Sequence, residues 1–350
     1  MDKQRILDIF IFSLILTSTF LLIDSKLEIS KFLEEESKIR YTYDNITIDT
    51  YFCPDENCLG EILLRINKST DIVCAFYDLD IEEIIKQLET KNARLIIDEG
   101  NKEKVDDANI EYVTDKSTRY MHNKFCVFDN KTVLTGSMNP TYNGAEVNRN
   151  NIIFIESEKI AENYLDKFDR MFYENEFKAN DARPPKYQIV RDNNRNITVH
   201  TLFCPESRCE KRLLEYMKES KNKILFMTFS FTSKPIGELL ISLMKDEIND
   251  KEIVVKGIFD RFHNINSQWS QYQHFLRINK SNFRLSKSPG KLHNKVFIID
   301  DKITITGSYN PSKNANINND ENIVIITSRE ITEKYINEFN KLWKLYEEDI

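Results

Sequence analysis

Two stretches of the chain carry the side chains that could do chemistry, in the same order and with the same spacing. Residues 122–139 read HNKFCVFDNKTVLTGSMN, and residues 293–310 read HNKVFIIDDKITITGSYN. In each stretch a histidine and a lysine stand two residues apart, an aspartate follows, and Gly-Ser-x-Asn comes last. An imidazole beside an ammonium group, a hydroxyl and an amide forms a receptor for an anionic tetrahedral group such as phosphate.

The spacing also predicts how these side chains point. Residues i and i+2 of a β-strand lie on the same face of the sheet. Each His–Lys pair and each Ser–Asn pair therefore shares a face. The pairs are His122 and Lys124, Ser137 and Asn139, His293 and Lys295, and Ser308 and Asn310. Period-two alternation thus predicts two matching sets of phosphate-binding groups.

Both stretches belong to a longer internal repeat. Upstream, Phe52-Cys53-Pro54 with Cys58 corresponds to Phe203-Cys204-Pro205 with Cys209, and Asp98 corresponds to Asp260. We expect one half at residues 47–178, a linker at 179–195 and a second half at 196–350. Strands alternate with amphipathic helices in each repeat, which predicts an α/β fold of two pseudo-symmetric halves, each a mixed β-sheet flanked by helices.

Composition sets limits on the function. The 350 residues are 41% hydrophobic and carry a formal net charge of -7, which argues against a uniformly basic protein that coats nucleic acid but leaves room for a local basic cleft. An apolar run from Ile9 to Ile23 is short for a bilayer span of about 20 residues. No small-residue cleavage site follows it. For residues 1–28 we expect a hydrophobic helix that acts as a single-pass membrane anchor, with a signal peptide or a docked helix as alternatives. A charged stalk is expected at 29–46.

The pattern His-x-Lys-x4-Asp-x6-Gly-Ser-x-Asn resembles that of the phospholipase D superfamily and stands here twice, complete. The Phe-Cys-Pro turn and Ser230-Phe231-Thr232 resemble its nuclease-like branch, which includes membrane-anchored members. The resemblance implies a two-step displacement without metal or cofactor. One histidine would attack phosphorus to form a phosphohistidine, and the other would protonate the leaving oxygen and then activate water.

The resemblance also implies roles for the remaining motif residues. Lys124, Lys295, Asn139 and Asn310 would hold the non-bridging oxygens of the phosphate, Ser137 and Ser308 would support them by hydrogen bonds, and Asp129 and Asp300 would hold structure rather than contact substrate. Because the duplication supplies both histidines, a monomer should suffice for catalysis.

The halves differ after the motif. The second half has Asn319-Asp320-Glu321-Asn322, whereas the first has Asn148-Arg149-Asn150-Asn151, so Asn150 stands where Glu321 stands. By the resemblance, the acid bonds the histidine of the opposite half. A carboxylate raises the basicity of an imidazole and fixes its tautomer, while an amide only orients it. We therefore predict His122 as the nucleophile, supported by Glu321, and His293 as the acid/base, facing Asn150.

The substrate is predicted as a phosphodiester, with nucleic acid favoured and phospholipid hydrolysis or headgroup transfer as the alternative. In residues 261–290 aromatic side chains interleave with Arg and Lys, a mixture that suits single-stranded nucleic acid, with a lipid interface or a lid that packs on its own domain as alternatives. The aromatic residues are Phe262, Trp269, Tyr272, Phe275 and Phe283. A catalytically silent module that only binds phosphate is a further alternative. The two intact His–Lys pairs argue against it.

The cysteines leave several interpretations open. Cys53/Cys58 and Cys204/Cys209 fit zinc ligands, local disulfides or packed thiols, and the compartment decides between them. Cys74 and Cys126 lie within apolar strands, where we expect core thiols.

Overall fold

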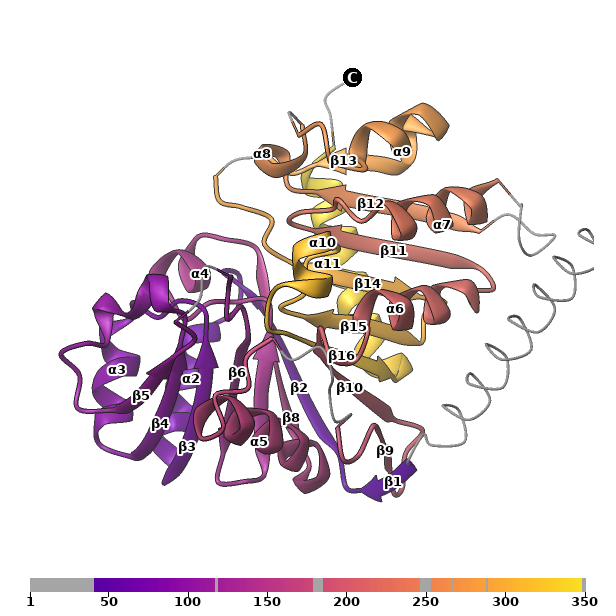
Figure 1. The fold of residues 1–350 in the computed structure, drawn as a ribbon. Helices are drawn as coiled ribbons and strands as arrows, with labels where there is room; N and C mark the ends of the chain where they lie inside the picture. Colours follow the sequence, from indigo (N-terminus) through magenta and orange to yellow (C-terminus); the bar gives the residue numbers. More distant parts are fainter. Residues whose placement is uncertain are drawn as a thin grey trace, which may run out of the picture. The chain divides into compact units, whose positions relative to one another are not determined.

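The computed structural model describes residues 41–116, 119–178, 185–245, 253–265, 267–287 and 289–347. These residues form two α/β halves, each with its own mixed sheet (Figure 1). The predicted fold class is confirmed for this part of the chain. The hydrophobic helix expected within residues 1–28 lies outside the described residues.

The first half runs from β2 to α5 and contains a seven-stranded sheet in the order β2-β8-β7-β6-β3-β4-β5. The pairs β3–β4 and β4–β5 are parallel and the other pairs are antiparallel. Its elements are β2 (Thr47–Cys53), α2 (Cys58–Lys68), β3 (Asp71–Phe76), α3 (Glu82–Glu89), β4 (Asn92–Ile97), η1 (Glu99–Lys104), β5 (Glu111–Thr114), β6 (Lys124–Phe128), β7 (Thr132–Gly136), α4 (Tyr142–Glu146), β8 (Asn150–Glu156) and α5 (Glu158–Phe172).

The second half, β10 to α11, repeats this strand order as β10-β16-β15-β14-β11-β12-β13. Its elements are β10 (Thr198–Cys204), α6 (Cys209–Lys218), β11 (Lys223–Thr228), α7 (Lys234–Met244), β12 (Val254–Phe259), α8 (Arg261–Asn264), α9 (Tyr272–Ile278), η2 (Lys280–Asn282), β13 (Phe283–Leu285), β14 (Lys295–Ile299), β15 (Ile303–Gly307), α10 (Lys313–Ile317), β16 (Glu321–Thr327) and α11 (Arg329–Leu345).

Two further strands extend the second sheet to nine. β1 (Tyr41–Asp44) pairs in parallel with β9 (Ile189–Asp192), and β9 pairs antiparallel with β10. β1 lies in the expected stalk and β9 in the expected linker, so these parts of both segments are strands. The reason is local: Val190 is buried, and the Asp192 carboxylate accepts a hydrogen bond from the backbone nitrogen of Ile46 at 2.8 Å.

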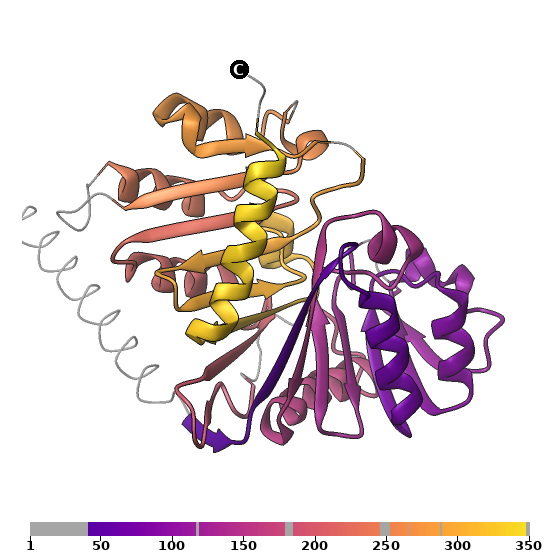
Figure 2. The ribbon, with the colours of Figure 1, turned by 180° about the vertical axis from the view of Figure 1, so that it is seen from behind.

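The helices α5 and α11 lie at the centre of the largest apolar cluster, which contains residues of both halves. Tyr164 and Phe168 of α5 and Tyr335 and Phe339 of α11 are fully buried there. α5 contacts β10 of the second half, and α11 contacts β2 of the first. Figure 2 shows α11 lying across the second sheet. Because helices cover both faces of the central strands, those strands are apolar throughout rather than alternating.

All six cysteines are paired in disulfides, which decides between the alternatives left open above. Cys53 bonds Cys58, and Cys204 bonds Cys209. Cys74 and Cys126 are buried in the core as expected, but they are not free thiols. They stand directly opposite each other on β3 and β6, a register that brings two side chains of one face together.

The predicted single-pass membrane localisation is corrected here. In the part of the chain that the structure describes, no helix combines the length and the apolar character needed to cross a membrane. The predicted segment 1–28 lies outside that part. We therefore do not retain the membrane localisation.

Candidate active site

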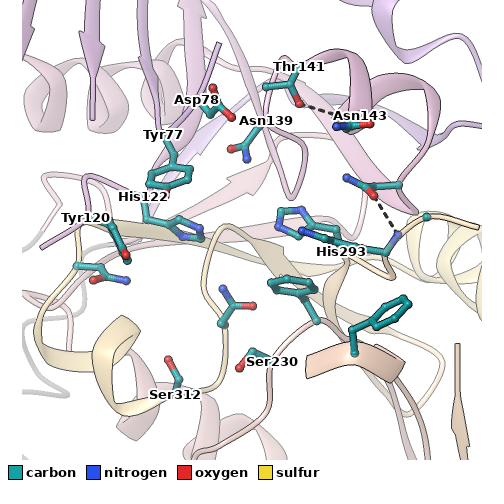
Figure 3. A pocket seen from close by; sticks show the side chains of 18 of the residues that line it. Tyr77, Asp78, Tyr120, His122, Asn139, Thr141, Asn143, Ser230, His293 and Ser312 are labelled. Carbon is teal, nitrogen blue, oxygen red and sulfur yellow. Dashed lines mark hydrogen bonds between the residues drawn. The ribbon is translucent and has the colours of Figure 1, made fainter. Parts of the chain in front are cut away.

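The two motif histidines face each other across a cavity of about 720 Å³ (Figure 3). The cavity is lined from both halves, and the wall residues include Asn139 from the first motif and Asn310 from the second. His122 lies two residues before Lys124, the first residue of β6, and His293 stands at the same position before Lys295 of β14. The duplicated strand pairs therefore present equivalent side chains to a shared space.

Short backbone bridges between the halves hold each histidine in place. The backbone nitrogen of His122 donates to the carbonyl of Asp320 at 2.9 Å, and that of His293 donates to the carbonyl of Arg149 at 2.8 Å. Met121 pairs with Asp320, and Leu292 pairs with Arg149, as isolated parallel bridges. Each histidine is thus fixed to the residue that precedes Glu321 or Asn150 in the opposite half.

Behind His122 lies a carboxylate of the second half. The Nδ1 atom of His122 and the Oε2 atom of Glu321 are 2.7 Å apart, and the Glu321 side chain is 0% exposed. The Ser308 hydroxyl donates to the same oxygen at 2.6 Å, and the Asn319 amide donates to Oε1 at 3.1 Å. With its Nδ1–H donated to Glu321, neutral His122 carries its lone pair on Nε2.

Behind His293 lies an amide of the first half. The Nδ1 atom of His293 is 2.9 Å from Oδ1 of Asn150. The Asn150 amide nitrogen donates to the carbonyl of Gly144 at 2.9 Å, and the Ser137 hydroxyl donates to Oδ1 at 2.8 Å, so the network fixes the orientation of the amide. Ser137 and Ser308 therefore support the groups behind the histidines, rather than the lysines and asparagines as we expected.

The motif lysines are nearly inaccessible, at 2% for Lys124 and 3% for Lys295. Each ammonium group donates to the carbonyl of the histidine two residues earlier, at 2.7 Å in both halves. Each also lies over an aromatic ring: Lys124 over Tyr77 at 5.2 Å and Lys295 over Phe229 at 5.1 Å. The hydrogen bonds and ring contacts thus hold the two lysine side chains in fixed positions beside the histidines.

Burial sets the protonation of these groups. It lowers the pKa of His122 to about 4, although the Glu321 carboxylate opposes the shift. Burial, reinforced by Lys295 and Lys124, lowers the pKa of His293 well below its usual range. The pKa of Lys124 falls to about 7 through burial, again opposed by Glu321, and burial with Lys124 lowers that of Lys295. Both imidazoles are therefore neutral at pH 7, and an arriving anion would raise all four pKa values.

Other motif residues shape the backbone. Asp129 and Asp300 lie at the far ends of their strands, where Asp129 accepts from the backbone nitrogens of Thr70 and Asp71 at 2.9 and 3.0 Å, and Asp300 holds the turn at 221–223 in the same way. Gly136 has φ +140°, and a Cβ there would lie 2.3 Å from the carbonyl oxygen of Asn151. The glycine of Gly-Ser-x-Asn is thus required by close approach of β8.

Sequence reasoning missed the aromatic walls of the cavity. The ring of Tyr77 lies 5.1 Å from that of His122, and the ring of Phe229 lies 4.7 Å from that of His293. Both follow the last residues of matching strands, β3 and β11, so the repeat itself could have identified them. Of the aromatic residues expected from 261–290, Phe262 lines the cavity, whereas Tyr272, Phe275 and Phe283 are buried in the core.

Asp98 and Asp260, which the repeat paired without a role, also act on the histidines. Asp98 accepts from the backbone nitrogen of Met121, and Asp260 from that of Leu292, both at 3.0 Å. Each carboxylate thus anchors the residue directly before a motif histidine. Burial and the neighbouring Asp115 raise the pKa of Asp98 to about 6.

Comparisons with known proteins agree with this architecture. The family model described as "Cardiolipin synthase, PLD-like domain" matches residues 37–172 and again 213–343. The phospholipase D of Rickettsia bellii is 30% identical over 165 residues, which cover 46% of this chain and 78% of the relative. The mitochondrial cardiolipin hydrolase of Chlamydomonas reinhardtii is 23% identical over 151 residues, or 41% of this chain and 65% of the relative.

A solved structure shows the same fold over both halves. The phosphatidylserine synthase of Haemophilus influenzae superposes with a TM-score of 0.62, covering 86% of this chain and 89% of its own, at 12% identity. The family model covers most of the chain and matches it twice. The chain therefore belongs to the phospholipase D superfamily, as a member that carries two PLD-like domains.

Proposed function

We propose that the protein hydrolyses phosphodiesters through a phosphohistidine, with one active site built from both halves of one chain. The observation that carries the proposal is the contact between His122 Nδ1 and Glu321 Oε2 at 2.7 Å. It leaves a lone pair on Nε2 of a buried, neutral imidazole that lines the cavity. A neutral imidazole with a fixed tautomer is the form that can attack phosphorus.

In the first step, Nε2 of His122 attacks phosphorus and the bond from phosphorus to the leaving oxygen breaks. His293, protonated in the complex with the anionic substrate, donates the Nε2 proton to that oxygen. In the second step His293 takes a proton from water, the water oxygen attacks phosphorus, and the P–N bond breaks to release His122. Lys124 and Lys295 would stabilise the charge on the non-bridging oxygens, together with the amides of Asn139 and Asn310.

The proposed reaction uses no metal ion or cofactor. The two lysine ammonium groups supply the positive charge that stabilises a pentacoordinate phosphorus, in a position where a metal ion would otherwise be needed. Activity should therefore persist in excess EDTA. Activity that EDTA abolishes and Mg²⁺ restores would contradict this part of the proposal.

As substrate we favour single-stranded nucleic acid. Aromatic rings from both halves line the cavity: Tyr77 and Tyr120 come from the first half, and Phe229 and Phe262 come from the second. Tyr120 is 50% exposed and Phe262 is 65% exposed, so both rings are open to stacking with bases. Such pairs fit the two nucleosides on either side of a phosphodiester.

Phospholipid is the second candidate, because two of the relatives are a phospholipase D and a mitochondrial cardiolipin hydrolase. Asp78 and Asp80 on the cavity wall also disfavour a polyanion. A side-by-side assay of bis(p-nitrophenyl) phosphate, single-stranded DNA and RNA, phosphatidylcholine and cardiolipin in EDTA separates these candidates. Turnover of none of them would favour a silent phosphate-binding module instead.

A further inference from the structure

Charged side chains from both halves form a buried cluster behind His122. Lys167 and Arg170 come from α5 of the first half, whereas Glu206 and Asp320 come from the second. The Lys167 ammonium lies 3.1 Å from a carboxylate oxygen of Glu206 and 3.1 Å from one of Asp320. Arg170 lies 3.3 Å from Glu206. The side chains of Lys167, Glu206 and Asp320 are 0% exposed, so their charges depend on one another.

The repeat places a corresponding cluster behind His293, with the halves exchanged, but this cluster is only partly buried, since the side chains of Lys341 and Asp55 are 49% and 33% exposed. Glu338 and Lys341 come from α11 of the second half, and Asp55 and Arg149 come from the first. The Lys341 ammonium lies 2.5 Å from Asp55 and 3.1 Å from Glu338, and Arg149 also pairs with Asp55. Each cluster thus joins the closing helix of one half to the Cys-Pro turn and motif loop of the other.

The two clusters differ in sign at two of their four positions. The residue at the Cys-Pro turn is acidic in both clusters, and the helix residue nearer the C-terminus of its helix, called the outer helix position, is basic in both. The helix residue three positions earlier, called the inner helix position, and the residue in the motif loop have opposite charges in the two clusters. The equivalent pairs are Asp55 and Glu206 at the turn, Arg170 and Lys341 at the outer helix position, Lys167 and Glu338 at the inner one, and Arg149 and Asp320 in the loop.

These reversals make unlike halves complementary and like halves repulsive. In the native pairing behind His122, two cationic helix residues face two carboxylates of the other half. Behind His293, one cationic and one acidic helix residue face one carboxylate and one cation of the other half. If the first half paired with a copy of itself, Lys167 and Arg170 would face Asp55 and Arg149, with excess positive charge. Two second halves would bring excess negative charge together. Charge without a partner is strongly unfavourable in the buried cluster behind His122, and less so in the partly exposed cluster behind His293.

The reversed loop position is also the residue that holds the histidine of the other half. The backbone carbonyl of Asp320 accepts from the backbone nitrogen of His122, and the backbone carbonyl of Arg149 accepts from that of His293. Correct pairing of the charges therefore fixes the backbone on which Glu321 and Asn150 reach their histidines. We propose that the charges of the two clusters favour pairing of the first half with the second and disfavour pairing of two like halves. By doing so they position the histidines.

The test exchanges charges within the full chain without changing its composition. The double variant R149D/D320R keeps every residue type and the net charge, but it mismatches both clusters. Adding K167E/E338K restores complementary signs in both clusters, again with the native composition. The matched control is K131E/E156K, an exchange of an ion pair whose side chains are 54% and 46% exposed.

We expect the double variant to lower the thermal midpoint by roughly 5–10 °C, with a parallel loss of bis(p-nitrophenyl) phosphate hydrolysis. The quadruple variant should recover at least half of the lost midpoint, while the control stays within about 1 °C of the parent. A double variant as stable as the parent would overturn the proposal. So would a quadruple variant no more stable than the double, including the case in which neither folds.

The mass in solution tests the selection between partners. In the double variant each half becomes complementary to a copy of itself, so a two-chain species should grow with concentration in light scattering and disappear in the quadruple variant. If the double variant is destabilised yet keeps the parent mass at all concentrations, the clusters hold the halves together but do not choose between them. That outcome would overturn the selective part of the proposal.

Discussion

The two halves of this protein share strand order and motif spacing, yet each presents a different group to the histidine of the other. The second half places the Glu321 carboxylate against His122, whereas the first places the Asn150 amide against His293. Both groups accept from Nδ1 and both are held by a motif serine. The two halves therefore share the scaffold of the two imidazoles and differ in the charge behind them, and this difference is the basis of the roles that we propose for His122 and His293.

The core differs between the halves in a similar way. The disulfide Cys74–Cys126 joins β3 to β6 of the first half. At the equivalent cross-strand pair of the second half, Phe226 stands opposite Phe297. One half thus ties its two central strands covalently at the point where the other packs two rings. The two halves therefore share the arrangement of the histidines but stabilise their central strands by different contacts.

Removing either histidine should have the largest effect on activity. We expect His122→Ala and His293→Ala each to lower kcat for a nucleic-acid or alkyl diester by about 10⁴-fold or more, because nucleophile and proton donor act as a unit. Steady-state hydrolysis measures this. His274→Ala, on the exposed face of α9, is the control. Substantial activity in either single variant would mean that the halves do not share one site.

Replacing the carboxylate behind His122 with an amide, as the other half has behind His293, should have the next largest effect on kcat. Glu321→Gln keeps the shape but removes the charge, and we expect kcat to fall about 100-fold because His122 loses the partner that fixes its tautomer. The exposed Glu83→Gln is the matched control. The exchange E321Q/N150E sharpens the comparison, since it should move part of the nucleophile's role to His293. An unchanged kcat in Glu321→Gln would show that the carboxylate has no part in the reaction.

The pH profile should reveal the buried cations of the free enzyme. His122 must be neutral to attack, so kcat/KM should fall as the pH drops toward its pKa of about 4. With bis(p-nitrophenyl) phosphate, whose leaving group needs little help from a protonated His293, Lys124 must still be charged, so kcat/KM should also fall as the pH rises through its pKa of about 7. Lys124→Arg should change only the alkaline limb, because a guanidinium stays charged, and the alkaline limb that remains would then belong to Lys295. An alkaline limb that does not move would assign it to another group.

The smallest effect on activity, and a moderate one on stability, is expected from the disulfides. Cys74–Cys126 spans a sequence separation of 52, and its replacement by C74A/C126A should lower the free energy of unfolding by about 4 kcal/mol. The pair Cys53–Cys58 spans 5, and C53A/C58A should cost about 2 kcal/mol. Denaturant unfolding measures both. Equal losses in the two variants would contradict an effect that depends on loop length.

The sequence was sufficient for the parts of the site that depend on local spacing. The two-residue interval of His122 and Lys124 and the repeat of the whole motif led to the fold class and the facing histidines. Tyr77 and Phe229 were not predicted: the repeat places them at equivalent strand ends, but the sequence alone does not show that these strand ends turn toward the cavity. The pairing of Cys74 with Cys126 depends on strand register between β3 and β6, which apolar runs do not determine.

Charge in the sequence did not always indicate exposure to solvent. The segment containing Tyr41–Asp44 was expected to be a solvated stalk, but pairing with β9 places it in the second sheet. Lys167 and Asp320 were ordinary charged residues in the sequence, and only the approach of the two halves buries them together. Such contacts join residues far apart in the chain, so their partners become visible only in three dimensions.

We propose that His122 is the nucleophile of an active site made from both halves. The most direct test is acid-quenched labelling with a p-nitrophenyl diester carrying phosphorus-32, followed by peptide mapping, in the parent protein and in both histidine variants. Because p-nitrophenolate needs little protonation to leave, His293→Ala should accumulate label on His122 and stall, while His122→Ala should take up none. Label found on His293 while His122 is intact would reverse the two roles and contradict the account.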